Sequence, residues 1–124
     1  AKERVAALSK DILNDARAVN GARLLAKEVD LDAQGMKDLA FRLKDANPDL
    51  LMVLGGRHEG KALLTVLVGQ QLIDERGLKA TDVVKQLASE IKGGGGGQPF
   101  LATAGGKDPD GIPRALAKAA ALLD

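Results

Sequence analysis

The sequence predicts an α/β fold, in which a mixed sheet is layered with helices and preceded by an N-terminal helix. Residues 50–54 form a continuous apolar run, which is typical of a strand buried on both faces. The stretches 32–46 and 81–92 instead repeat apolar residues every three or four positions, as amphipathic helices do. A strand at 22–29, the first of these helices and the strand at 50–54 follow one another. This order indicates a parallel pair of strands joined by a right-handed crossover.

Length and composition fit one small domain. Of the 124 residues, 45% are hydrophobic and 28% are charged, as in ordinary globular proteins. Phe41 and Phe100 are the only aromatic residues, which argues against the stacking platforms of single-strand nucleic-acid binders. The net charge of +1 gives no general basic field, so a site for a polyanion has to be local.

Compartment is suggested by what the sequence lacks. There is no cysteine, which suits a reducing compartment, and no signal peptide or apolar run long enough for a membrane span. We therefore expect a cytoplasmic protein with no membrane partner. The chain begins Ala-Lys-Glu-Arg in helical style, so we interpret it as a piece of a longer protein.

The N-terminal residues 1–18 predict a helix. Apolar side chains recur at helical spacing, at Val5, Leu8, Ile12 and Val19. This seam resembles the end of a coiled coil, and an amphipathic helix packed on its own domain explains it equally well. Because Asn20-Gly21 breaks the helix, we divide the chain into a helical, coiled-coil-like linker end at 1–19 and a globular domain at 20–124. Val5, Leu8 and Ile12 are the candidates for a dimerisation seam.

The middle of the chain continues the alternation of helices and strands. Asp32 is the expected N-cap of the helix that Asn47-Pro48 stops. Residues 55–60 predict a turn that joins the strand at 50–54 to an apolar strand at 61–68 in a hairpin. Residues 69–77 predict an irregular connector with a short helical turn.

The last third predicts two helices and a short strand. Thr81 is the expected cap of a helix that ends at Lys92, near the negative end of the helix dipole. A strand at 100–104 and a turn at 105–106 follow. Asp108 or Asp110 then caps a final helix with Pro113 in its first turn.

Five consecutive glycines, 93–97, lie between a predicted helix and a predicted strand. Glycine loses more backbone freedom on folding than any other residue, so such a run is either a flexible linker or a segment whose bare backbone is needed. The residues after position 97 are too few to form an independent domain. We therefore interpret the run as a glycine-rich loop inside one domain, whose bare amides suit a negatively charged or planar ligand.

The sequence offers no catalytic constellation. His58 is the only histidine, its neighbour Glu59 is too close to share one metal ion with it, and no serine lies in a strand-to-helix elbow. The glycine run follows a helix, precedes a strand and lacks the Lys-Ser/Thr of a nucleotide-binding loop. We therefore expect no catalytic residue, no metal and no cofactor in this chain. What remains is a backbone-rich concavity with basic neighbours, which suits phosphate and sugar edges held by shape.

The segment 93–106, Gly-Gly-Gly-Gly-Gly-Gln-Pro-Phe-Leu-Ala-Thr-Ala-Gly-Gly, resembles the glycine-rich signature of the C-terminal domain of alanyl-tRNA synthetases. This domain belongs to the DHH-associated family, which some phosphoesterases and exonucleases share. The similarity extends back through 50–68, 78–81 and the N-terminal helical segment. Gln98 departs from the Arg or Lys of many synthetases, and the histidine that follows a shorter glycine run in phosphoesterase-type relatives is missing, which favours the synthetase branch.

The resemblance implies a tRNA-binding and assembly module whose parent enzyme uses ATP and metal ions in other domains. Its implied partners are alanine-specific tRNA, docked at its folded corner, the other domains of the parent and, as a possible homodimer, a second copy. The implied RNA contacts are Lys92, Gly93, Gly94, Gly95, Gly96, Gly97, Gln98, Gly105, Gly106, Lys107 and Arg114. Two alternatives stay open at this point: the substrate-binding domain of a DHH-type phosphodiesterase or exonuclease, and a pure dimerisation domain.

Overall fold

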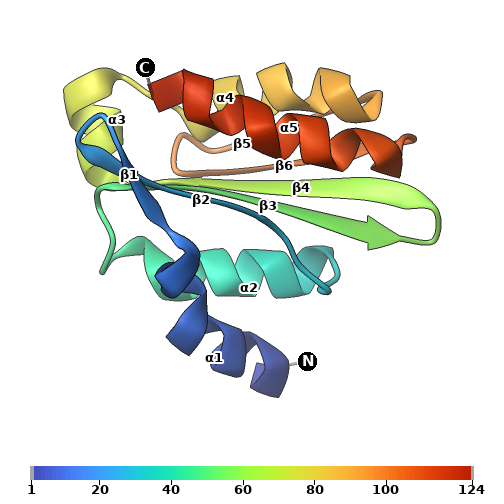
Figure 1. Ribbon diagram of the computed structural model, residues 1–124, viewed down its shortest axis with the longest axis horizontal. Helices are drawn as coiled ribbons and strands as arrows, with labels where there is room; N and C mark the ends of the chain where they lie inside the picture. The colour runs from blue at the N-terminus through green and yellow to red at the C-terminus, as the bar shows by residue number, and fades with distance from the viewer. Residues whose placement is uncertain (1, 124) are drawn as a thin grey trace.

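A computed structural model describes residues 2–123 and shows a six-stranded sheet with helices on both faces (Figure 1). The strands, in chain order, are β1 (Arg17–Val19), β2 (Ala22–Glu28), β3 (Leu50–His58), β4 (Lys61–Val68), β5 (Gly93–Gly97) and β6 (Leu101–Gly106). The α-helices are α1 (Lys2–Asp11), α2 (Ala33–Lys44), α3 (Gln70–Arg76), α4 (Ala80–Ala88) and α5 (Ile112–Lys118). The order of strands in the sheet is β1-β2-β3-β4-β6-β5. The predicted fold class is confirmed.

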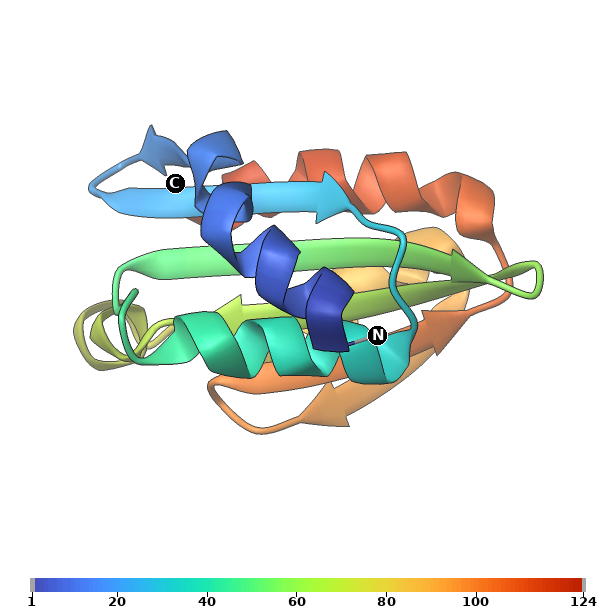
Figure 2. The same ribbon diagram turned by 90° about the horizontal axis from the view of Figure 1, so that it is seen from below.

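The sheet is mixed because β2 and β3 run parallel while all other neighbouring pairs are antiparallel. Helix α2 connects the parallel pair, as the strand-helix-strand order predicted. Helices α4 and α5 cover one face of the sheet, and α1 and α2 cover the other (Figures 1 and 2). Strand β3 therefore alternates between two cores: Leu51 and Val53 face the first pair of helices, and Met52 faces the second.

Helix α2 forms as its sequence predicted. The Asp32 side chain accepts a hydrogen bond from the backbone N–H of Gly35 at 2.7 Å and so caps the first turn. At the other end, Asn47 Nδ2 donates to the carbonyl of Leu43 at 2.7 Å. The helix buries Met36, Leu39, Ala40 and Leu43 against the sheet.

The N-terminal helix is shorter than predicted. Helix α1 ends at Asp11, a 3-10 turn follows at Ile12–Asp15, and Arg17–Val19 is an edge strand antiparallel to β2. The prediction of helix through residue 18 was wrong because Asn20 and Gly21 adopt positive φ angles of 49° and 82°. An Asn-Gly pair in this conformation is a tight hairpin turn rather than only a helix stop, and it pairs Val19 with Ala22.

Two segments in the middle of the chain also differ from prediction. Strand β3 continues to His58, so the hairpin turn lies at Glu59-Gly60 rather than over 55–60. Within it, Gly55 is packed so closely that a Cβ would lie 2.6 Å from Ile112 Cγ2 on α5. Residues 70–76 form a regular helix instead of an irregular connector.

Helix α4 starts one residue earlier than its predicted cap. Lys79 occupies the N-cap position without a side-chain hydrogen bond, and Thr81 lies inside the helix. The helix ends at Ala88 and continues as a 3-10 turn to Ile91. Lys92 then adopts a left-handed conformation with φ of 55°, which turns the chain out of the helix.

The glycine run is a strand, not a loop. Strand β5 pairs antiparallel with β6 over its whole length, from Gly93 opposite Gly106 to Gly97 opposite Ala102. A tight turn at Gln98 joins the two, with Gln98 N–H donating to the Leu101 carbonyl at 2.7 Å. Residues 105–106 accordingly end β6 instead of forming a turn. The prediction that Asp108 or Asp110 caps the final helix was wrong, because Asp108 Oδ1 accepts from the backbone N–H of Asp110 at 3.1 Å and so caps a 3-10 turn at Pro109–Gly111. Helix α5 follows this turn, with Gly111 at its N-cap and no side-chain cap.

Candidate nucleic-acid interface

Strand β5 forms one edge of the sheet and is exposed along its whole length. Helix α4 packs on one face of β5 and β6. On the opposite face, α2 lies over the middle of the sheet, and β5 projects beyond it together with the far end of β6 (Figure 2). The glycines therefore present backbone on an open sheet face and along a free edge.

The five glycines of β5 fall into two structural classes. A Cβ added at Gly93, Gly95 or Gly97 would overlap a backbone carbonyl oxygen of β6, so close approach of the two strands excludes side chains there. A Cβ added at Gly94 or Gly96 would meet nothing within 4 Å. Packing inside the described chain thus explains three of the glycines and leaves the other two without a steric reason.

The two unexplained positions lie on the open face. Residues directly opposite in an antiparallel pair share a face, and Gly94 lies opposite Gly105, while Gly96 lies opposite Thr103. Gly105 is also free of crowding, since its nearest neighbour to an added Cβ is the Ala62 carbonyl at 3.9 Å. Gly94 and Gly105 therefore form a bare area that spans two strands.

A hollow of about 400 Å³ adjoins this bare area, and three lysines line it. Its lining residues are Lys61, Ala62, Leu63, Lys92, Gly93, Gly105, Gly106 and Lys107. No carboxylate is among them, and none of the three lysines forms an ion pair within the described part of the chain. The hollow is thus a local concentration of positive charge in a chain of net charge +1.

The structure brings together only part of the predicted contact set. Lys92, Gly93, Gly105, Gly106 and Lys107 line one hollow. Gly97 and Gln98 lie at the opposite end of β5, next to the turn into β6. The strand length separates these two groups by about 13 Å at roughly 3.3 Å per residue.

Lys61 is a member of the hollow that the sequence did not indicate. It begins β4, and the next residue, Ala62, lies opposite Gly106 at the end of β6. The only sequence signal was a charged residue at the start of an apolar strand. Its place beside Lys92 and Lys107 depends on the pairing of β4 with β6.

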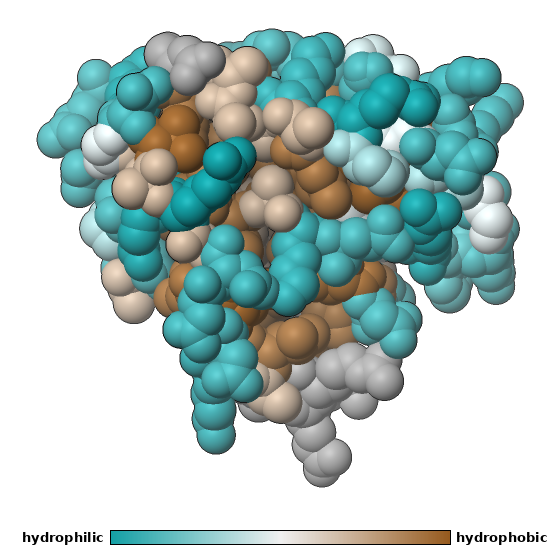
Figure 3. All heavy atoms as spheres, in the orientation of Figure 1, coloured by the Kyte–Doolittle hydropathy of each residue, from teal (hydrophilic) through white to brown (hydrophobic). Residues whose placement is uncertain are grey.

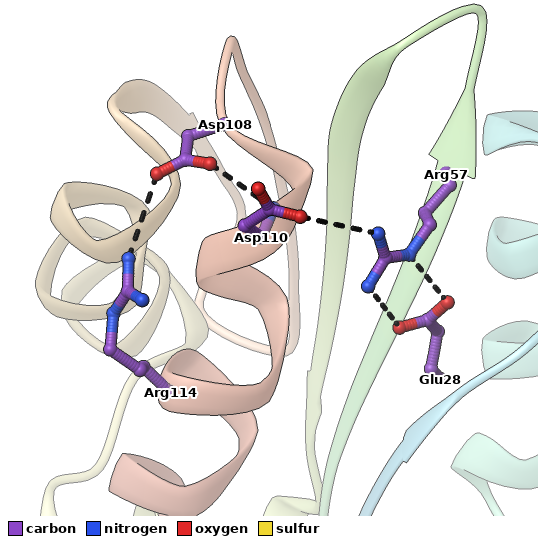
Figure 4. A network of polar contacts seen from close by, with 5 residues as sticks. All are labelled: Glu28, Arg57, Asp108, Asp110 and Arg114. Carbon is purple, nitrogen blue, oxygen red and sulfur yellow. Dashed lines mark hydrogen bonds and ion pairs between the residues drawn. The ribbon is translucent and has the colours of Figure 1, made fainter.

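Arg114 does not line the hollow. Its guanidinium lies beside carboxylates instead (Figure 4). Its guanidinium lies 3.6 Å from Asp108 Oδ2 and 3.9 Å from Glu90 Oε1. The neighbouring Arg57 donates to Glu28 at 2.9 Å and lies 3.8 Å from Asp110. The hydrogen bond to Glu28 raises the pKa of Arg57.

The network of five side chains drawn in Figure 4 connects β2 and β3 to the segment before α5. Because Arg114 already has two acidic partners, it is poorly placed to neutralise an external phosphate.

The other chemistry-bearing residues form no reactive group. His58, the last residue of β3, has an exposed side chain whose Nε2 lies 3.8 Å from Glu59 Oε1. Among the described residues, no three His, Asp or Glu side chains are clustered as metal ligands. The same residues include no helix that is long and apolar enough to cross a membrane.

The residues predicted as a dimerisation seam lie largely inside the chain's own core. Val5 and Ile12 are 1% and 2% exposed, packed in the same cluster as Met36 and Leu39 of α2, and Leu8 is half-buried beside it. Pairing of two chains through Val5 and Ile12 would therefore require α1 to leave α2. On the side of the molecule drawn in Figure 3, hydrophobic residues are interspersed with hydrophilic ones.

The described residues thus form an α/β domain with a mixed sheet whose bare glycine edge lies beside a lysine-lined hollow. The chain belongs to the DHHA1 domain family, whose model matches residues 21–124. It is 43% identical over 122 residues to the alanine–tRNA ligase of Christiangramia forsetii, a match that covers 98% of this chain and 14% of that protein. It is 42% identical over 117 residues to the alanine–tRNA ligase of Anaeromyxobacter dehalogenans, covering 94% of this chain and 13% of that protein.

The chain thus spans about one seventh of the length of these relatives, and the segment they share corresponds to one small domain. The fold is also that of a solved structure, the C-Ala domain from Aquifex aeolicus alanyl-tRNA synthetase. The TM-score is 0.78 at 24% identity, with 87% of this chain and 96% of that chain covered.

Proposed function

We propose that this chain is a tRNA-binding module of an alanine–tRNA ligase. The bare face at Gly94 and Gly105 would receive the RNA backbone, and Lys61, Lys92 and Lys107 would neutralise its phosphates. Aminoacylation and editing, with ATP and metal ions, would belong to other domains of the parent enzyme. The identity to alanine–tRNA ligases favours this function over the phosphodiesterase alternative.

One observation carries the proposal: Gly94 and Gly105 lack side chains although the fold has room for them. A glycine inside a strand is unfavourable by roughly 0.5–1 kcal/mol relative to alanine. Gly94 and Gly105 therefore lower the stability of the sheet although no packing contact requires a glycine at either position. We propose that these glycines allow a ligand to approach the backbone closely. The lysines of the adjoining hollow make that ligand an anion, and a ridge of RNA phosphates fits an open, side-chain-free surface.

The test is binding of purified alanine tRNA to the chain as a function of salt. We expect the affinity to fall steeply with salt, because neutralised phosphates release counterions. Lys107→Glu is expected to weaken binding about tenfold and to reduce the salt slope by about 1. Gly94→Val is expected to weaken binding with a normal thermal unfolding curve, since its side chain enters open space.

The matched control is Lys85→Glu. Lys85 is an exposed lysine on α4, on the covered side of the sheet, so this variant changes net charge by the same amount without touching the hollow. Equal weakening by Lys85→Glu and Lys107→Glu would show that only net charge matters. Unchanged binding by both Gly94→Val and Lys107→Glu would refute this surface as the contact.

A further inference from the structure

The two phenylalanines, which are the only aromatic residues of the chain, lie side by side at the surface. Their ring centroids are 6.3 Å apart at an interplanar angle of 61°, an edge-to-face contact. Phe41 is 57% exposed and is the one large hydrophobic residue, among those described, that is exposed. The two aromatic side chains of the chain therefore lie together at one place on the surface.

The core does not require Phe41. Helix α2 packs on the sheet through Met36, Leu39, Ala40 and Leu43, all of them buried. Position 41 lies on a different stripe of the helix, which it shares with Lys37 and Lys44 at spacings of four and three residues.

This stripe faces the open strands. Phe41 contacts Phe100, and Lys44 Nζ lies 4.8 Å above the Phe100 ring. Phe100 immediately precedes β6, so its contact with Phe41 places that ring near the start of β6. The stripe thus carries one exposed ring together with Lys37 and with a Lys44 that pairs with Asp45 at 3.2 Å. Asp38 and Arg42 line a separate hollow at Phe41.

We propose that Phe41 stacks against an unpaired nucleobase of the RNA whose phosphates occupy the lysine hollow. This inference rests on the proposed RNA-binding function and adds a second contact at the other end of the same face. A nucleotide offers a planar base to the ring and a phosphate to the neighbouring Lys37, whereas an apolar protein surface would bury that ammonium group. Lys44 is already paired with Asp45 at 3.2 Å.

The spacing fits a continuous strand of RNA. Strand β6 and its flanking residues run from Phe100 at one end to Lys107 at the other, a length of about 23 Å at roughly 3.3 Å per residue. That length corresponds to about seven nucleotides at the ~3.4 Å spacing of a stacked strand. One short RNA segment can therefore reach both the ring and the hollow across the bare glycines.

The test uses Phe41→Trp, because the chain has no tryptophan or tyrosine of its own and the new indole is the only such fluorophore. A base stacked on the indole quenches its emission. We expect quenching by alanine tRNA and by a single-stranded RNA octamer, and none by a long blunt RNA duplex bound through phosphates alone. The matched control is Lys85→Trp on α4, whose emission is expected to stay unchanged.

Phe41→Ala provides the second measurement. We expect it to weaken tRNA binding about fivefold or more while the salt slope stays that of the original chain, because no phosphate contact is lost.

Three outcomes would contradict the inference, and they can be told apart. Tight, salt-dependent tRNA binding by the Phe41→Trp variant without quenching of its indole would overturn the stacking contact and leave the phosphate contact standing. Indole emission that shifts with protein concentration alone would also overturn it, since a second copy would then cover the ring. Absence of any tRNA binding would remove the proposed function itself.

Discussion

Strands β3 and β5 belong to the same sheet but are held in it differently: β3 by its buried apolar side chains, and β5, which has no side chains, by backbone pairing. Strand β3 lies between two helical layers and buries Leu50 to Leu54 completely. Strand β5 has no side chains, is exposed throughout and is supported by α4 on one face only. The centre of the sheet is thus built by apolar side chains, and its edge is held by backbone pairing. A sheet with a stable centre can keep an edge whose composition serves a ligand instead of the core.

The largest expected effect distinguishes the two classes of glycine in β5. Gly95→Val places a side chain against the Thr103 carbonyl and is expected to cost at least about 4 kcal/mol of unfolding free energy, enough to unfold many small domains. Gly94→Val, one residue away, is expected to change it by less than about 1 kcal/mol. Urea unfolding of the two variants measures the contrast, and equal costs would contradict it.

The next effect compares the centre of the sheet with β6, the strand next to its glycine edge. Leu54→Ala removes a fully buried side chain between β3 and α2 and is expected to cost about 2–5 kcal/mol. Thr103→Ala on β6 lies in the same row of the sheet but is half-exposed, and its expected cost is below about 1 kcal/mol. Thermal unfolding of both variants gives the difference; comparable losses would mean that β6 is packed as tightly as the centre.

A stabilising substitution tests the strand between these two. Thr65 is 1% exposed, and its Oγ1 has no hydrogen-bond partner among the described residues. A buried hydroxyl without a partner carries a desolvation cost, so Thr65→Val is expected to raise the unfolding free energy by about 1 kcal/mol. Thr103→Val serves as the control, because the half-exposed hydroxyl of Thr103 retains access to water. A loss of stability in Thr65→Val would reveal a partner for the hydroxyl.

The smallest expected effect concerns an ion pair at the start of the parallel strands. Arg23 Nε and one terminal nitrogen donate to the two oxygens of Asp49 at 3.0 and 2.7 Å. These hydrogen bonds lower the pKa of Asp49 from its ordinary value of 3.8. The unfolded chain therefore takes up the proton first as pH falls. The contribution is complete above about pH 4 to 5 and is lost as pH falls through the lowered pKa.

Asp49→Asn is the corresponding variant. Since both side chains are about one third exposed, we expect it to cost only about 1 kcal/mol at pH 7. The difference from the original chain should shrink between about pH 5 and pH 2, in urea unfolding at several pH values. A difference that grows on acidification would contradict the direction of the pKa shift.

Much of the fold followed from local patterns. Asp32 as a cap, the buried stripe of α2 and the two-sided burial of 50–54 were all predicted and are confirmed. The prediction failed where the same dipeptide can either end a helix or form a hairpin turn. Asn20-Gly21 was interpreted as the end of a helix, but pairing with β2 made it a hairpin turn. The Asn-Gly pair predicts a turn from the local sequence alone. Whether the residues before it form a helix or a strand depends on their pairing with β2.

The candidate site was predicted in composition but not in geometry. Gly93, Gly105 and Gly106 meet Lys92 and Lys107 in one hollow, which the glycines at 94–97 do not line. Arg114 pairs with carboxylates, and Lys61 joins the hollow from another strand. The RNA contacts of these residues stay a prediction, as does the role of a second copy of the chain. Arg114 could not be assigned from sequence because the position of Glu90 and Asp108 depends on how two turns pack.

By itself the sequence determined the α/β class, the parallel pair and the presence of an unusual glycine segment, because periodicity and composition act through local backbone preference and burial. Only the tertiary structure decided that this segment is an edge strand, because glycine has no side chain to express a preference and takes its conformation from its neighbour β6. The same pairing decided which glycines are sterically required and which leave the face bare. That distinction depends on atoms of another strand, and no pattern within residues 93–97 contains it.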